Sequence, residues 1–280
     1  MDYQILFSDL DGTLLRPDMT VNPADLDTIR QMAKEGIPFV PCTGRVHSEI
    51  PEELRNESAI RYYISANGAV TYDKETDTRT VRGISNRLLQ ETLALLNEYN
   101  ALYYIRHNSR TYSDATRHTA EEYITHGVND YDRDFLEVRA IRQADYAAFA
   151  KDLEDTEMIC AFFTSVEDTL ACKAKMEAGG EIYAANSYGT LLEIFHKDAG
   201  KGNAILQLAS ALGIAKEAVI AVGDTGNDIS AVQAAGLGLA VENATEPLKA
   251  VADAVICKNT ESPATYIYER YFKGEPHAEV

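Results

Sequence analysis

The sequence predicts an α/β protein: a parallel sheet with helices on both faces, interrupted by an inserted α+β domain. Two observations carry this prediction. Short apolar segments alternate with helical patterns near the amino end, and the same rhythm returns in the last third of the chain. The stretch between them instead combines tyrosine-rich hairpin-like segments with helices. Because the α/β rhythm resumes after this stretch, the middle is an insertion into one domain.

The first strand–helix–strand unit spans the opening forty residues. Asn22 and Pro23 resemble a helix cap and a first helical residue, and Leu26, Ile29 and Met32 recur at helical spacing before Gly36. The apolar segments QILFS and IPFVPC lie before and after this helix. Both are too short for helices and are bounded by turn residues, so we expect buried strands.

The last third repeats the pattern. A helix is indicated by Ile205, Leu208, Ala209 and Leu212, and it is followed by the apolar strand AVIAV, the helix ISAVQAA and the strand LGLAV. Strands joined through helices in this way form a parallel sheet covered on both faces.

The insert covers residues 84–187, where the hairpin-like ALYYIRHNSRTYS lies between helical patterns such as SNRLLQETLALLNEY and VEDTLACKAKMEAG. We therefore expect one domain built from residues 1–83 and 188–280, and a second, α+β domain built from residues 84–187.

The composition restricts the partners. The 280 residues carry a formal net charge of −18, which opposes binding to the phosphate backbone of a nucleic acid. No apolar run is long enough to span a bilayer, and the amino end lacks the pattern of a signal peptide. We expect a cytoplasmic protein without a membrane partner. Its four cysteines are far apart and fit neither disulfide nor zinc patterns, so reduced and mostly buried thiols are expected.

Two carboxylates stand where the first strand ends. In Asp9-Leu10-Asp11-Gly12-Thr13, the acidic side chains are one residue apart on a turn that glycine permits. One carboxylate could attack phosphorus while the other moves a proton to or from the leaving oxygen. Ligands of α/β proteins usually bind at this edge of the sheet. An acidic turn without catalytic function is the alternative.

Three further segments carry groups that suit an anion. Thr43 and Gly44, before Arg45, follow the second strand and could donate hydrogen bonds to a phosphate oxygen, although such a pair more often forms a plain turn. Asn67-Gly68 fits a hairpin turn. Lys201 opens a predicted helix, where its ammonium and the backbone amides would attract phosphate, with a solvated lysine as the alternative.

An acidic loop follows the strand AVIAV. Gly223-Asp224-Thr225-Gly226-Asn227-Asp228 could bring two carboxylates around a hard cation, and Mg²⁺ fits best because it prefers oxygen ligands and substrate phosphate. Asp228 could instead cap the next helix. Four of these segments fall at strand ends or helix starts of one sheet, which favours a single site: the carboxylate pair, Thr43-Gly44, Lys201 and the acidic loop.

These four segments match the four motifs of the haloacid dehalogenase-like (HAD) phosphatases, and the chain resembles the Cof-type phosphatases of subfamily IIB along its whole length. The resemblance implies a Rossmann-like core with a substrate-selecting cap where the insert lies. It also implies a Mg²⁺-dependent hydrolase that acts on a small phosphorylated metabolite, a sugar phosphate or phosphorylated cofactor, through an aspartyl-phosphate. Ala231 and the tail ESPATYIYERYF depart from the pattern of many relatives.

The resemblance also assigns roles. Asp9 is the nucleophile and a metal ligand, and Asp11 is the general acid/base with its backbone carbonyl on the metal. Asp224 completes the metal site, and Asp228 belongs to that site by holding it without touching the ion directly. The remaining residues would contact the phosphate or substrate: Thr43, Lys201, Asn227, the amides of Leu10 and Gly44, Arg45 and Asn67. A phosphomutase of the same superfamily and a non-catalytic module that binds phosphorylated metabolites remain as alternatives.

Overall fold

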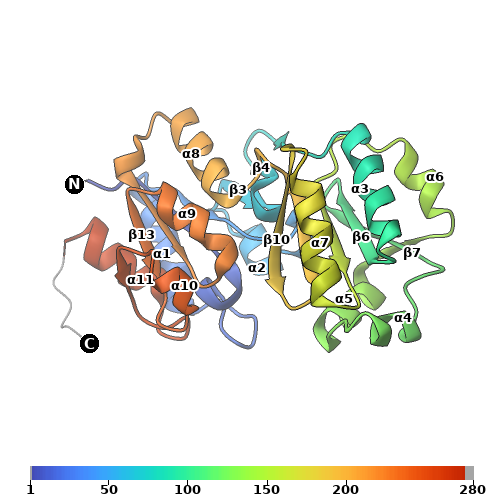
Figure 1. Cartoon of the computed structure of the whole chain (residues 1–280). Coiled ribbons are helices and arrows are strands. Elements are labelled where there is room, and N and C mark those ends of the chain that lie inside the picture. Colours follow the sequence, from blue (N-terminus) through green and yellow to red (C-terminus); the bar gives the residue numbers. More distant parts are fainter. Residues whose placement is uncertain (1, 275–280) are drawn as a thin grey trace. The chain divides into compact units, whose positions relative to one another are not determined.

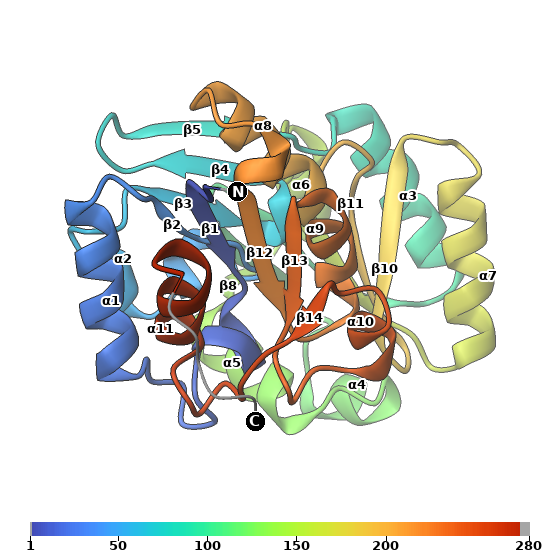
Figure 2. The ribbon, with the colours of Figure 1, turned by 90° about the vertical axis from the view of Figure 1, so that its left-hand side faces the viewer.

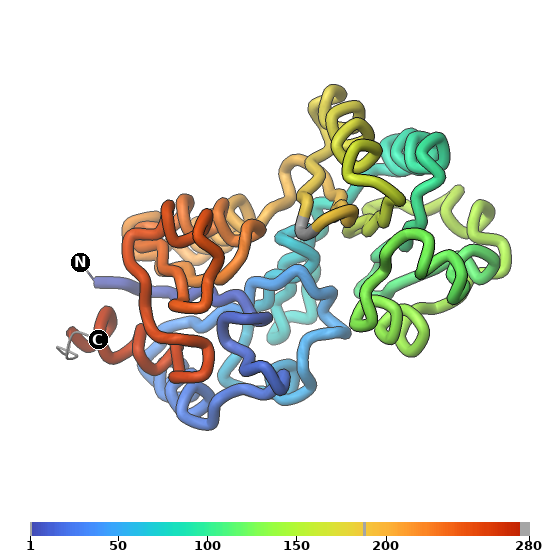
Figure 3. Tube along the Cα trace, turned by 60° about the horizontal axis from the view of Figure 1, so that its bottom comes forward, coloured from blue at the N-terminus to red at the C-terminus, as the bar shows by residue number. Residues whose placement is uncertain are grey.

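The computed structural model describes residues 2–274, which form two compact units (Figure 1). Unit 1 contains the residues up to Thr80 and those from Gly200 onward, and unit 2 contains residues Val81–Ala199. Figure 3 follows the chain out of unit 1 into the insert and back again. The expected insertion of one unit into the other is therefore observed.

Unit 1 is built on a five-stranded parallel sheet in the order β14-β13-β12-β1-β2. Its strands and helices are β1 (Ile5–Ser8), α1 (Pro23–Lys34), β2 (Phe39–Pro41), α2 (Glu52–Asn56), α8 (Lys201–Ala211), β12 (Val219–Gly223), α9 (Ile229–Ala234), β13 (Leu237–Ala240), α10 (Glu246–Lys249), β14 (Ala254–Val255) and α11 (Pro263–Ile267). The predicted parallel sheet is confirmed.

Helices cover both faces of this sheet, as expected (Figure 2). Successive strand residues point to opposite faces, so Leu6 of β1 packs with α1 and α11, whereas Ile5 and Phe7 pack with α8 and α9. The helix α1 begins as the sequence predicts, because the side chain of Asn22 accepts a hydrogen bond from the amide of Ala24 at 3.1 Å.

A second, antiparallel sheet extends unit 1 beyond β2. It contains β3 (Tyr62–Ser65), β4 (Val70–Asp73) and β5 (Thr78–Val81), in the order β3-β4-β5. A parallel bridge between Cys42 and Ile64 joins β3 to the end of β2. Asn67 and Gly68 lie in the turn that joins β3 to β4, in agreement with the hairpin interpretation.

Unit 2 is a six-stranded sheet in the order β10-β11-β9-β6-β7-β8, antiparallel except for the β7–β8 pair. Its elements are α3 (Asn86–Glu98), β6 (Leu102–His107), β7 (Arg110–Asp114), α4 (Ala120–Thr125), α5 (Asp130–Arg139), β8 (Ile141–Gln143), α6 (Tyr146–Lys151), β9 (Met158–Phe162), α7 (Val166–Glu177), β10 (Ile182–Tyr188) and β11 (Leu191–His196). Buried residues of α3, α6 and α7 form one core with Ile105, Ile159 and Leu192 of the sheet. The α+β prediction is confirmed.

The predicted limits of the insert need correction. Residues 81–83 and 188–199 belong to unit 2, although we expected them in the core. The later error has a clear cause: β11 pairs with both β10 and β9, so it is an interior strand of the unit 2 sheet. As an isolated apolar run, LLEIF fits a strand of either unit.

Two further expectations concern membrane-spanning helices and the cysteines. Among the described residues, no helix is both long enough and apolar enough to cross a membrane. All four cysteines are unpaired, and Cys42, Cys160 and Cys172 are buried, as predicted.

Candidate active site

The candidate site lies in unit 1, where loops follow the carboxyl ends of neighbouring strands. Asp9 directly follows β1, and its backbone amide donates a hydrogen bond to the carbonyl of Val222 in β12 at 3.0 Å. On the other side, the amide of Cys42 donates to the carbonyl of Ser8 at 2.7 Å. The parallel register therefore places the loops of Asp9, Thr43 and Asp224 at one edge of the sheet.

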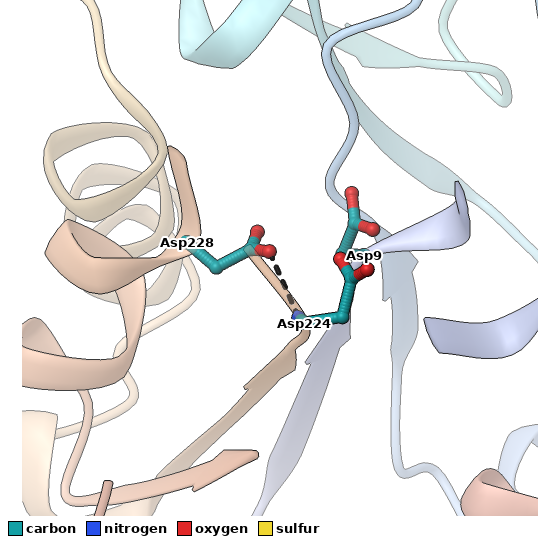
Figure 4. Close-up of side chains that lie close together, drawn as sticks. All are labelled: Asp9, Asp224 and Asp228. Atoms are coloured by element: carbon teal, nitrogen blue, oxygen red, sulfur yellow. Dashed lines mark hydrogen bonds between the residues drawn. The ribbon is translucent and has the colours of Figure 1, made fainter. Parts of the chain in front are cut away.

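Three carboxylates meet at this edge. Each of Asp9, Asp224 and Asp228 offers an oxygen atom, and these atoms lie within 4.8 Å of one another (Figure 4). Asp9 and Asp228 are buried, and Asp224 is half-buried. Such a cluster of oxygen ligands, gathered from three positions in the sequence, suits a hard divalent cation.

Lys201 supplies the positive charge within the cluster. Its Nζ lies 2.6 Å from Oδ1 of Asp9 and 2.6 Å from Oδ1 of Asp228, and its side chain is only 1% exposed. Burial opposes the charged ammonium, but the two carboxylates outweigh it and hold the pKa of Lys201 well above its usual value. The solvated alternative for Lys201 is therefore wrong.

The carboxylates remain in excess over this one ammonium. Burial and the neighbouring Asp228 raise the pKa of Asp224 to about 7. Burial also raises the pKa of Asp9, opposed by Lys201 and reinforced by Asp228 and Asp224. Oδ1 of Asp224 is buried and has no hydrogen-bond partner among residues 2–274. An uncompensated buried carboxylate oxygen fits a site that receives a cation.

Asp228 differs from the other two carboxylates because both of its oxygens are used. Oδ1 receives Lys201, and Oδ2 accepts hydrogen bonds from the amides of Asp224 at 3.0 Å and Thr225 at 3.1 Å. Its side chain therefore holds the acidic loop and the lysine in place. The alternative in which Asp228 caps α9 is not observed, because α9 has no side-chain cap.

Asp11 and Gly12 follow Asp9 in a tight turn. Gly12 has φ +75°, and a Cβ at this position would overlap the carboxylate of Asp224. The side chain of Asp11 is 46% exposed and is held by Arg45, whose Nε and Nη2 each lie 2.7 Å from one carboxylate oxygen. The two carboxylates of the turn thus have different environments, Asp9 buried and Asp11 partly solvated.

The residues that the sequence predicts to contact phosphate lie in the loops around Asp9 and Asp11. Thr43 follows β2 and is buried, and its Oγ1 accepts a hydrogen bond from the amide of Arg45 at 3.1 Å. Asn227 in the acidic loop donates from Nδ2 to Oδ1 of Asn67 at 3.2 Å. Leu10 is buried, and Gly44 lies close to the Asn67 side chain. Every candidate residue from the sequence therefore belongs to unit 1.

The sequence interpretation missed Asn243 and Asn259. Asn243 follows β13, and its Nδ2 donates to the carbonyl of Gly12 at 2.7 Å while its Oδ1 accepts from the amide of Asn259 at 3.0 Å. Asn259 in turn donates to the carbonyl of Leu15 at 2.8 Å. The two asparagines hold the turn that carries Asp11. A polar residue two positions after the strand LGLAV was the available signal for Asn243.

A carboxylate at the end of the first strand, a buried lysine against it and an acidic loop after a neighbouring strand define a class of α/β phosphoryl-transfer enzymes. The chain belongs to the haloacid dehalogenase-like hydrolases, because the model of that family matches residues 6–266. The family resemblance inferred from the four motifs is confirmed, and the chain is a phosphatase of this family.

Relatives extend over nearly the whole chain. Phosphatase YwpJ of Bacillus subtilis (strain 168) is 30% identical over 277 residues, covering 92% of this chain and 96% of its own length. Pyridoxal phosphate phosphatase YbhA of Escherichia coli (strain K12) is 26% identical, with 96% and 98% covered. The solved structure of a haloacid dehalogenase-like hydrolase from B. subtilis has a TM-score of 0.79 at 28% identity, with 95% and 99% covered.

Proposed function

We propose that this phosphatase is a Mg²⁺-dependent phosphomonoester hydrolase that acts on a small phosphorylated metabolite through an aspartyl-phosphate on Asp9. The observation that carries the proposal is the environment of Asp9: a buried carboxylate at the end of β1, in contact with Lys201 and within 4.8 Å of Asp224 and Asp228. A nucleophile needs this fixed position, and the incoming phosphate needs the positive charge.

The donor set fits Mg²⁺. Asp9, Asp224 and the backbone carbonyl of Asp11 would hold the ion, and the buried, unpartnered Oδ1 of Asp224 supports this assignment. Asp228 would not bind the ion directly. It would hold the metal site in place through its hydrogen bonds with the amides of the acidic loop and with Lys201. When bound, the ion supplies positive charge that reduces the repulsion between a carboxylate nucleophile and a phosphate anion.

The protein residues then divide the reaction between them. A carboxylate oxygen of Asp9 forms a bond to phosphorus as the bond to the leaving oxygen breaks, and protonated Asp11 gives its proton to that oxygen. As a carboxylate, Asp11 next takes a proton from the water that attacks the aspartyl-phosphate, which releases inorganic phosphate and restores Asp9. Lys201, Thr43 and Asn227 hold the oxygens of the phosphoryl group throughout.

The proposed substrate class is supported by the relatives rather than by the catalytic residues. One relative is named for pyridoxal phosphate, so phosphorylated cofactors are the first compounds to test, together with the sugar phosphates that the family resemblance implies. We include in the proposal that unit 2 selects among them and that the protein acts in the cytoplasm, where its four unpaired cysteines would stay reduced.

The test is phosphate release from a panel of phosphorylated sugars, cofactors and nucleotides, with and without Mg²⁺, for the wild type and Asp9→Asn. We expect turnover that needs Mg²⁺, is abolished by chelator and is not restored by Ca²⁺, whose longer bonds would misplace the nucleophile. Asp9→Asn should retain less than about a hundredth of the rate. A folded Asp9→Asn variant that keeps more than this would show that the nucleophile is misassigned.

A further inference from the structure

The turn between β3 and β4 has an unusual backbone. Three successive residues have positive φ: Ala66 at 49°, Asn67 at 52° and Gly68 at 92°. Glycine tolerates this region and asparagine visits it, but alanine there is uncommon. All three residues are buried. Such a conformation persists only where surrounding contacts impose it, and in this turn those contacts lead to three loops of the candidate site.

The first loop is the one that follows β2. The amide of Ala66 donates to the carbonyl of Arg45 at 2.8 Å, and the amide of Asn67 donates to the carbonyl of Thr43 at 3.1 Å. A Cβ on Gly44 would lie 3.0 Å from Oδ1 of Asn67, so the loop passes directly over that side chain. The turn therefore holds the backbone on both sides of Gly44.

The other two loops carry Lys201 and Asn227. A Cβ on Gly68 would overlap the carbonyl of Gly200, so the turn packs against the backbone where α8 begins. The side-chain oxygen of Asn67 accepts the Nδ2 hydrogen of Asn227 from the acidic loop at 3.2 Å. Asn67 is only 2% exposed, which removes it from solvent and leaves Asn227 as the more accessible of the two amides.

We propose that Asn67 is a positioning residue that acts on the phosphate through Asn227, and that the left-handed turn Ala66–Gly68 fixes the spacing of the Thr43, Lys201 and Asn227 loops. The inference rests on the proposed function in one respect, namely that Asn227 contacts the phosphate. From the sequence we expected Asn67 to contact the substrate directly; in this proposal Asn67 acts on the substrate only through Asn227. Because Nδ2 of Asn227 is held by Asn67, the amide is oriented before the phosphate arrives, and less ordering is needed on binding.

The test is a double-mutant cycle with inorganic phosphate as the probe. Asn67→Gly keeps the left-handed backbone and removes the side chain, so it separates the hydrogen bond from backbone strain. We expect it to raise the inhibition constant of inorganic phosphate and KM by about tenfold, with kcat changed less than about threefold, because the lost contact serves bound substrate and transition state alike. In an Asn227→Ala background, Asn67→Gly should change the inhibition constant by less than about twofold.

Asn100→Gly is the matched control. Asn100 is also left-handed, with φ 49°, and its Oδ1 accepts a hydrogen bond from Arg117 at 3.1 Å, but it is exposed and lies in unit 2. It should leave phosphate inhibition unchanged. The inference is overturned by an unchanged inhibition constant in Asn67→Gly, by an equal effect in the Asn227→Ala background, or by an equal effect of Asn100→Gly.

The two proposals can fail separately. Calorimetric binding of inorganic phosphate in the presence of Mg²⁺ reports on Asn67 and Asn227 even if the reaction does not pass through Asp9. Conversely, an Asn227→Ala variant with unaltered phosphate affinity overturns the role of Asn67 while leaving the Asp9 result intact.

Discussion

Arg45 donates hydrogen bonds to both carboxylate oxygens of Asp11. Its Nε lies 2.7 Å from Oδ2 and its Nη2 lies 2.7 Å from Oδ1, while Nη1 donates to the carbonyl of Glu49 at 2.8 Å. The pair connects the turn after β1 with the loop after β2. Because a planar guanidinium engages a carboxylate in a fixed geometry, Arg45 restricts the orientation of the proposed general acid/base.

Arg45→Lys should slow the reaction by misorienting Asp11. A lysine keeps the positive charge but cannot form the bidentate hydrogen bonds to Asp11. We therefore expect kcat to fall about tenfold for an alkyl phosphate, whose leaving oxygen needs a proton. The fall should be smaller for p-nitrophenyl phosphate, which has a better leaving group. The ratio of the two kcat values is the measurement.

A matched control exists in the same unit. Arg61 forms the same two-pronged contact with Asp73, at 3.0 and 2.8 Å, away from the candidate residues, and Arg61→Lys should leave both rates unchanged. If Arg45→Lys lowered both rates equally and raised KM, Arg45 would contact substrate directly and the positioning role would be lost.

Lys201→Met should remove activity and destabilise unit 1. The methionine nearly matches the length of lysine but leaves Asp9 and Asp228 as buried carboxylates without their shared ammonium, and removing one partner of a buried pair typically costs about 3–5 kcal/mol. We expect kcat/KM to fall at least about a hundredfold. Chemical unfolding and steady-state kinetics measure the two effects. As a control, Lys216→Met at an exposed position should change neither the stability nor kcat/KM. A Lys201→Met variant that stays stable and active would contradict the role assigned to Lys201.

The sequence predicted much of the parallel core because that information is local. The helix α1 follows from the cap at Asn22 and the spacing of Leu26, Ile29 and Met32, and the observed helix begins at Pro23 as expected. Placement of Asp9 and Asp224 at one edge of the sheet also followed, since parallel strands present their carboxyl ends together.

Contacts between distant loops were not accessible in the same way. The pair of Asn227 and Asn67 joins residues 160 positions apart, and nothing in either segment alone indicates the partner. Asn243 was missed because its role depends on reaching the carbonyl of Gly12. The return from the insert was placed at residue 188 because β11 has the composition of a buried strand of either unit, and only its pairing with β9 decides between them.

Asp25 should make stability depend on pH. It is fully buried in α1 and accepts hydrogen bonds from the amide and hydroxyl of Thr265, yet burial raises its pKa to about 6. A pKa that is higher in the folded state favours the protonated form, so the contribution of Asp25 to stability is greatest at low pH and is lost as pH rises through about 6.

Asp25→Asn removes this titration while keeping an oxygen acceptor for Thr265. The measured quantity is the free energy of unfolding of the variant minus that of the wild type. This difference should increase by about 1.4 kcal/mol from pH 5 to pH 8, and the expectation does not depend on the size of the difference at either pH. Urea unfolding at both pH values measures it. Asp27→Asn on the same helix, with an exposed side chain, should show no such increase. A constant difference between Asp25→Asn and wild type would refute the prediction.

Gly12→Ala should weaken Mg²⁺ binding by displacing Asp224. Gly12 has φ +75°, and an added Cβ would overlap the Asp224 carboxylate. The backbone strain is separable from this overlap, because Gly36 at the end of α1 has φ +76° and open space where its Cβ would lie. Alanine in this region costs about 1–2 kcal/mol at either position, and only Gly12→Ala adds the overlap with Asp224, so Gly12→Ala should lower the melting temperature at least as much as Gly36→Ala.

Only Gly12→Ala should change the response to the metal. We expect its half-saturating Mg²⁺ concentration for phosphate release to rise at least about tenfold, because a displaced Asp224 oxygen no longer completes the oxygen cluster with Asp9. Gly36→Ala should retain the wild-type value. Mg²⁺ titrations of activity, repeated by calorimetry without substrate, measure the difference. Equal Mg²⁺ requirements in the two variants would show that Asp224 either tolerates the displacement or does not hold the ion.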